Sequence, residues 1–259
     1  MPSRAVFYGV CGLLVAAGAA ATVAACASMS TMPGMSMPGG WTLSMIWMPL
    51  CGQTWARVTA SFVGMWTVMM VAMMLPSLAP VLWRYREALG SAGQGRAMSF
   101  TLLAGVGYFA VWTAWGAAVF VAGAALAALE MRMPALARAV PLTSGMVVLI
   151  AGALQFTAWK AHYLDCCRQA PGPGHGLPSS AGAALRHGLR LAVHCSCCCA
   201  GLTAALVVTG VMDLVAMTAV TAALTLERFA SRGERVARGI GWVIGGAGLF
   251  MIARAASLI

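Results

Sequence analysis

The sequence predicts an all-α, polytopic transmembrane helix bundle of about seven spans. Two observations predict this class. First, 61% of the 259 residues are hydrophobic while only 8% are charged, whereas a soluble protein carries about a quarter charged residues. Second, the apolar residues form runs of the roughly 20 residues that a helix needs to cross a bilayer. These values exclude a soluble enzyme, a disordered protein and a nucleic-acid-binding protein as main interpretations.

Seven apolar runs are candidate spans. They cover Ala5–Ala27, Val58–Trp83, Ser99–Leu129, Pro141–Tyr163, Leu185–Thr209, Val211–Phe229 and Val236–Ser257. The fifth and sixth form one run that is too long for a single crossing, so we expect a tight turn between them. Most of the 16 basic residues then fall on the side of the N-terminus. Because cytoplasmic loops carry the excess of Lys and Arg, the sequence predicts the N-terminus inside, the C-terminus outside and a bacterial inner-membrane location.

The chain divides at about residue 57. Residues 1–57 hold the first span and an outer loop rich in Met, Pro and Gly, which we expect to be irregular. Residues 58–259 form a membrane domain of six spans that carries the Met and Cys motifs. The first span has an alternative interpretation, because Arg4, the apolar run and the segment Val23–Cys26 resemble a signal peptide that ends at a lipoprotein cleavage site. In that case Cys26 is lipidated and six spans remain.

The strongest chemical signal is a cysteine cluster in the fifth span. Cys195, Cys198 and Cys199 are spaced i, i+3 and i+4, so they share one face of a helix. His194 and Cys197 lie on the neighbouring face. Thiolates select Cu(I), Zn(II) and other soft ions, so this face is a candidate metal site.

A second thiol pair, Cys166 and Cys167, follows the fourth span on the same predicted side of the membrane. That compartment is reducing, so the thiols stay free to bind a ligand. The alternative is that each Cys is only a small residue that packs well between membrane helices. The clustering favours metal or thiol chemistry, and the sequence leaves open whether the two Cys groups form one site.

Methionines repeat along the second span. Met69 and Met73, like Met70 and Met74, are spaced i, i+4, so their thioethers stack on adjacent turns. Thioethers are neutral and can line a path through lipid without the cost of burying a charge. They bind Cu(I) and largely ignore hard ions. The alternative interpretation, in which Met is a flexible apolar filler, stays open.

The predicted outer loop adds a third set of sulfurs. Met32, Met35 and Met37 are spaced two and three residues apart, and they resemble the thioether arrays of copper-uptake and copper-resistance proteins. A hydrophobic patch at the membrane surface is the alternative. In this topology thioethers lie outside and at mid-membrane, and thiols lie inside. Because thiolate is the stronger donor, affinity for Cu(I) rises inward, which suits inward passage or capture.

Three segments combine into a wider pattern. They are the Ala-Met-Met-Leu-Pro segment within Trp66–Ser77, the fourth-span ending from Gln155 to Arg168, and the Cys-x-x-Cys-Cys motif of Cys195–Cys199. Together they resemble a bacterial family of predicted metal-binding integral membrane proteins, over roughly Val58–Arg228. The resemblance implies metal binding and no particular activity. Cys197 and Tyr163 depart from the pattern, because the family has Gly and Cys at these positions.

The leading functional hypothesis is a Cu(I)-handling membrane protein that acts in uptake or as a membrane-held chaperone. Another soft ion such as Hg(II) is a variant. The sequence leaves catalysis undecided and favours a protein that is not an enzyme. A quinone-linked thiol oxidoreductase using Cys195 and Cys198 is a second hypothesis, although their predicted inner position opposes it. A metal-independent assembly factor for a membrane complex is a third. The expected partners are the lipid bilayer, a metal ion and either another protein or a second copy of the chain, with no nucleic acid.

Overall fold

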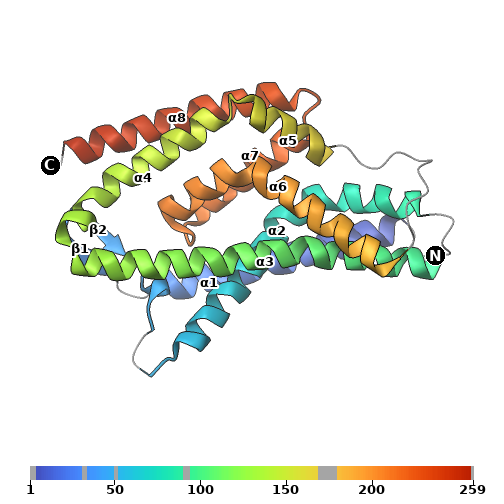
Figure 1. Ribbon diagram of the computed structural model, residues 1–259, viewed down its shortest axis with the longest axis horizontal. Helices are drawn as coiled ribbons and strands as arrows, with labels where there is room; N and C mark the ends of the chain where they lie inside the picture. Colours follow the sequence, from blue (N-terminus) through green and yellow to red (C-terminus); the bar gives the residue numbers. More distant parts are fainter. Residues whose placement is uncertain (1–3, 31–33, 50–51, 90–93, 169–179, 258–259) are drawn as a thin grey trace.

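A computed structural model describes residues 4–30, 34–49, 52–89, 94–168 and 180–257. Eight α-helices lie in these ranges (Figure 1). They are α1 (Arg4–Ser30), α2 (Trp55–Ala88), α3 (Gln94–Arg132), α4 (Pro134–Leu154), α5 (Ala158–Arg168), α6 (Ala181–Gly210), α7 (Leu214–Phe229) and α8 (Gly233–Ala256). The predicted all-α class is therefore confirmed.

The loop after α1 is more ordered than the sequence predicts. Strands β1 (Met35–Met37) and β2 (Trp41–Leu43) pair as a short antiparallel hairpin, and the 3-10 helix η1 (Met45–Trp47) follows. Gly39 and Gly40 both have positive φ, a backbone conformation that favours glycine and that makes the turn of the hairpin. The expectation of an irregular loop was wrong for this part, because the paired glycines Gly39 and Gly40 form a hairpin turn.

Six of the helices are long and apolar enough to cross a membrane, and these are α1, α2, α3, α4, α6 and α8. The predicted span Pro141–Tyr163 was wrong as one element. Helix α4 ends at Leu154, and α5 starts at Ala158. Between them the Thr157 hydroxyl accepts a hydrogen bond from the backbone N–H of Lys160 at 3.3 Å, so the chain starts a new helix with a side-chain cap. The predicted sixth span is α7, whose 16 residues extend about 24 Å at 1.5 Å per residue.

The long helices run roughly along one axis of the molecule, and the two termini lie at opposite ends of that axis (Figure 1). Helix α1 packs on α2, α3 packs on α6, and α4 packs on α8. Helix α7 packs against α2, α6 and α8, while its Val215, Leu226 and Phe229 are exposed. Which end faces the cytoplasm stays a prediction.

Close helix approach depends on two glycines. A Cβ on Gly188 of α6 would lie 2.0 Å from the carbonyl oxygen of Ala104 in α3. A Cβ on Gly152 of α4 would lie 2.6 Å from the backbone nitrogen of Gly245 in α8. Small residues at such crossings let the backbones touch, as is common between membrane helices. The contact at Gly188 fixes α6 against α3 and so determines where the cysteines of α6 lie.

Candidate metal centre

Helix α6 carries three buried cysteines at its midpoint. Cys195, Cys198 and Cys199 are 1%, 3% and 0% exposed, so the shared face points into the bundle. The sulfur atoms of Cys195 and Cys199 lie 3.9 Å apart. Cys197 and His194 are half-buried, and the ring of His194 lies beside that of Tyr163 with 5.9 Å between centroids. These two residues lie outside the buried set.

Helix α5 adds a fourth thiol. Cys167 is buried, and its thiol lies near enough to Cys195 and Cys198 to interact with both, as Cys198 does with Cys199. We call these four residues the thiol cluster. Two groups that are about 30 residues apart in sequence are thus brought together. The neighbouring Cys166 is not part of the cluster, because its sulfur lies 3.7 Å from Nε2 of His162 on an exposed side of α5.

The spacing of one sulfur pair fits a single soft ion. Thiolate sulfur lies about 2.3 Å from a bound ion such as Zn²⁺, so two sulfurs 3.9 Å apart would subtend an angle of about 115° at the metal. That angle lies between tetrahedral and trigonal geometry. Within the described ranges, no group of three or more His, Cys, Asp or Glu side chains is already arranged to hold an ion. The cluster therefore offers a pair directly, and side-chain rotation is needed to recruit a third sulfur.

A guanidinium group faces this pair. Nη2 of Arg228 in α7 donates to the sulfur of Cys195 at 2.7 Å and to that of Cys199 at 3.2 Å. Nη1 donates to the hydroxyl of Ser77 in α2 at 2.5 Å, and the hydroxyl of Tyr108 in α3 donates to Cys195 at 2.9 Å. Four helices thus place hydrogen-bond donors and sulfurs around one point. The ion pairs found among the described residues do not include Arg228, so its charge is directed at the sulfurs.

A second cation beside the cluster is already neutralised. The ammonium of Lys160 in α5 lies 2.7 Å from a carboxylate oxygen of Glu227 and donates to the carbonyl oxygen of Cys198 at 2.9 Å. Burial lowers the pKa of Lys160, but the negative charges of Cys198 and Glu227 outweigh this effect and raise the pKa overall. Gln155 donates to the other oxygen of Glu227 at 2.9 Å. A pocket of about 300 Å³ opens beside Lys160 and is lined also by Glu234.

The charge balance favours a monovalent ion. Lys160 and Glu227 cancel, which leaves the single positive charge of Arg228 beside the sulfurs. Two thiolates with one monovalent ion carry a net charge of −1, which a guanidinium neutralises. The same two thiolates with a divalent ion are neutral, so Arg228 would have no counter-charge from the pair, and burying it would be costly unless a third thiolate joined the ion.

Sequence reasoning did not select Arg228, Ser77, Tyr108, Lys160 or Glu227 as site residues. The signal available was that Ser77 and Lys160 fall inside the family-like segments and that all five lie within the wider family-like range Val58–Arg228. Arg228 lies at the end of the predicted span Val211–Phe229, where a basic residue is expected to mark the cytoplasmic side, and only the packing of α7 against α2 and α6 shows its partners.

The methionines of α2 are buried as a group. Met69, Met70, Met73 and Met74 are each at most 5% exposed. Met69 and Met73 line a cavity of about 610 Å³ between α1, α2 and α7, which Met217 of α7 also lines. All four belong to the main hydrophobic core, but Met70 and Met74 do not line this cavity.

The structure does not bring the predicted loop methionines to either place. Met35 is exposed in β1, and Met37 packs against Leu43 and Ala137. Met32 lies outside the described residues. Whether these three methionines bind a metal is left untested.

The fold and this site define an all-helical protein with several apolar helices of spanning length and a buried sulfur cluster suited to a soft ion. The copper chaperone family PpoB2 matches residues 63–251. The chain belongs to this copper chaperone family. The match supports the predicted metal binding and the predicted copper. It includes the thiol cluster, Arg228 and the buried methionines of α2. Comparison with curated proteins gives no match, and comparison with solved structures gives none either.

Proposed function

We propose that this protein is a membrane-held chaperone that receives Cu(I) as its cargo and holds it at the thiol cluster. The observation that carries the proposal is the pair of sulfurs of Cys195 and Cys199, 3.9 Å apart, with the guanidinium of Arg228 bonded to both. Soft thiolates select Cu(I) over hard ions. The fixed charge of Arg228 favours Cu(I) over a divalent soft ion, because only the monovalent complex with two thiolates is anionic.

A stripe along α2 supports movement of the ion toward the cluster. Met65, Met69, Met73 and Ser77 are each four residues apart, so they lie on one face of the helix. The stripe is about 18 Å long at 1.5 Å per residue, and it ends at Ser77, which Arg228 contacts. Successive thioethers are about 6 Å apart along the axis, and Met side chains are flexible, so an ion can pass from one sulfur to the next without becoming free.

The direction of transfer follows from donor strength. Thioethers are neutral donors, whereas thiolates are charged and bind Cu(I) more tightly. An ion that arrives along Met65, Met69 and Met73 therefore stops at the thiol cluster. With the N-terminus inside, the cluster lies toward the cytoplasmic side of the inner membrane. The six apolar helices of spanning length support the membrane location.

The proposal is tested by metal binding to the detergent-purified chain. The parent protein is loaded anaerobically with Cu(I), desalted and analysed for copper. We expect about one tightly held equivalent in the parent and its loss in Cys195→Ser/Cys199→Ser. The matched control is Cys166→Ser/Cys197→Ser, which removes two half-buried cysteines outside the cluster and should keep the metal. Full retention by the first variant, with both variants monodisperse in size-exclusion chromatography, would show that the pair is not the holding site.

A further inference from the structure

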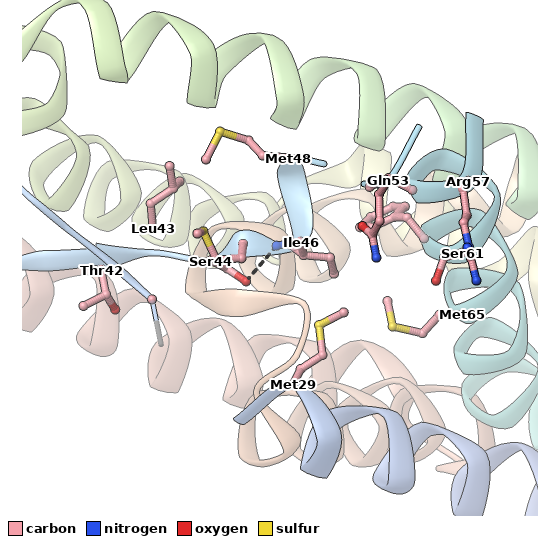
Figure 2. A pocket seen from close by; sticks show the side chains of 14 residues that line it. Met29, Thr42, Leu43, Ser44, Ile46, Met48, Gln53, Arg57, Ser61 and Met65 are labelled. Carbon is pink, nitrogen blue, oxygen red and sulfur yellow. Dashed lines mark hydrogen bonds between the residues drawn. The ribbon is translucent and has the colours of Figure 1, made fainter. Parts of the chain in front are cut away.

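A second group of sulfurs lies at the opposite end of the α2 stripe. A pocket of about 480 Å³ is lined by four methionines that come from separate parts of the chain. They are Met29 at the end of α1, Met45 in η1, Met48 just after η1 and Met65 in α2. Figure 2 shows Met29 of α1 and Met65 of α2 directed toward each other, with Met48 lining another side of the space and its side chain extending toward Leu43. We call it the thioether pocket.

The pocket is held in shape by an aromatic anchor between two of its methionines. The ring of Trp47 packs against Phe62 of α2 at 5.2 Å and Phe120 of α3 at 6.4 Å between centroids. Gly123 of α3 makes room for it, because a Cβ there would lie 2.3 Å from Trp47. The hydroxyl of Ser44 accepts a bond from the backbone N–H of Ile46 at 3.5 Å (Figure 2) and caps η1. The short helix is thus fixed to α2 and α3, and its flanking methionines are fixed with it.

The lining chemistry selects a soft cation. The pocket residues include no Asp, Glu or His, so hard ions find none of their preferred charged ligands there. The four methionines are half-buried rather than buried, which differs from the fully packed Met70 and Met74 of the core. A methionine that serves only as an apolar filler gains most when it is enclosed. Here the thioethers instead line an accessible space.

One positively charged side chain lowers the affinity of this pocket for cations. The exposed Arg57 also lines the pocket, and its charge opposes every positive ion, a divalent ion twice as strongly as a monovalent one. Neutral donors beside a guanidinium give weak, exchangeable binding. Weak binding suits a site that accepts an ion and passes it on.

We propose that the thioether pocket is a second soft-metal site, which takes up Cu(I) through Met29, Met45, Met48 and Met65 before the ion reaches the thiol cluster. The inference rests on the proposed chaperone function. Met65 belongs both to the pocket and to the stripe on α2, so it connects the two sites. The pocket binds more weakly than the cluster, because it offers thioethers where the cluster offers thiolates.

The test is a titration of the full chain in detergent with Ag(I), a redox-stable monovalent soft ion, followed by calorimetry. We expect two classes of site in the parent, one tight and one weaker. In Met29→Leu/Met48→Leu/Met65→Leu the weaker class should be lost while the tight class remains. The matched control replaces three exposed methionines elsewhere, in Met131→Leu/Met133→Leu/Met146→Leu, and should keep both classes.

A second titration separates this inference from the proposed function. In a variant with all four cysteines of the thiol cluster changed to Ser, the weaker class should persist, and adding the three pocket changes should weaken Ag(I) binding at least tenfold. Loss of the tight class alone bears on the cluster, and loss of the weaker class alone bears on the pocket. A parent with one class of site, or pocket changes that leave both classes intact, would overturn the inference even if the cluster binds copper.

Discussion

The charge of Arg228 should decide which ion the thiol cluster prefers. Changing Arg228→Gln keeps a side chain that can still donate to Ser77 or Cys195 but removes the positive charge. A monovalent ion held by Cys195 and Cys199 forms an anionic complex and loses its counter-charge. A divalent ion forms a neutral complex, so the attraction of the guanidinium to the thiolates and its repulsion of the ion are lost together and largely cancel. The variant should therefore weaken Ag(I) and Cu(I) far more than Cd(II).

The size of the effect follows from the two contacts at 2.7 and 3.2 Å between the guanidinium and the sulfurs. A hydrogen bond to a charged group contributes about 1.5–3 kcal/mol net. Each 1.4 kcal/mol changes a dissociation constant tenfold, so we expect Ag(I) affinity to fall roughly 10- to 150-fold. The change for Cd(II) should be much smaller, because two opposing effects of the same charge are removed together.

The assay is competition calorimetry of the purified chain with Ag(I) and with Cd(II), in the parent, Arg228→Gln and Arg228→Lys. The Lys variant keeps the charge and should keep most of the preference for Ag(I). If both ions weaken by the same factor in Arg228→Gln, the arginine acts only on the structure or on the thiols themselves. Such an unchanged ratio of the two affinities would refute the charge argument.

Three further predictions concern stability and transfer. Glu227→Gln leaves the ammonium of Lys160 buried without its carboxylate partner. Breaking such a pair costs about 3–5 kcal/mol, so the thermal unfolding midpoint in detergent should drop clearly. An unchanged midpoint would mean that water already reaches Lys160. In Gly188→Ala the new Cβ meets a backbone oxygen at 2.0 Å, whereas in Gly182→Ala of the same helix it meets nothing within 4 Å. Only the first change should lower the unfolding midpoint, because an overpacked contact costs roughly 1–3 kcal/mol of unfolding free energy. Equal midpoints for the two variants would contradict the close crossing of α6 and α3. Met73→Leu keeps the volume but removes one thioether, so Ag(I) uptake into proteoliposomes should slow while the equivalents held at the thiol cluster stay the same; unchanged uptake would argue against the stripe.

Part of the site could be predicted from the sequence, because the spacing of residues along a helix is a local property. Cys195, Cys198 and Cys199 share a face whatever surrounds them, and the structure shows that this face is buried. The sequence also selected Cys167, but it left open whether Cys167 joins the cysteines of α6, because that depends on the chain breaking after Leu154 and continuing as α5. That break depends on the helix cap at Thr157. A hydropathy value is averaged over a window of residues, so it does not reveal a single capping residue.

The remaining contacts could not be predicted because they join distant elements. Arg228 is one residue in a run that is typical of a cytoplasmic loop, and its partners lie in α2 and α6. The methionines that line the pocket of Figure 2 are not the regularly spaced Met35 and Met37. Met35 and Met37 lie in the hairpin, whereas η1 packs against α2. The spacing of the methionines in the sequence gives no information about which of these segments contacts α2.

The short length of α7 has a consequence for how a lipid bilayer meets this protein. Its 16 residues extend about 24 Å, whereas the hydrocarbon layer is about 30 Å thick. Either the bilayer thins beside α7, or headgroups and water follow the helix end inward. That end carries Glu227 and Arg228, and the pocket beside Lys160 opens nearby. In the proposed membrane location, this hydrophobic mismatch would bring the aqueous phase toward the end of α7 that holds Arg228 against the thiol cluster, and a recipient of the ion would then not need a channel through the whole bundle.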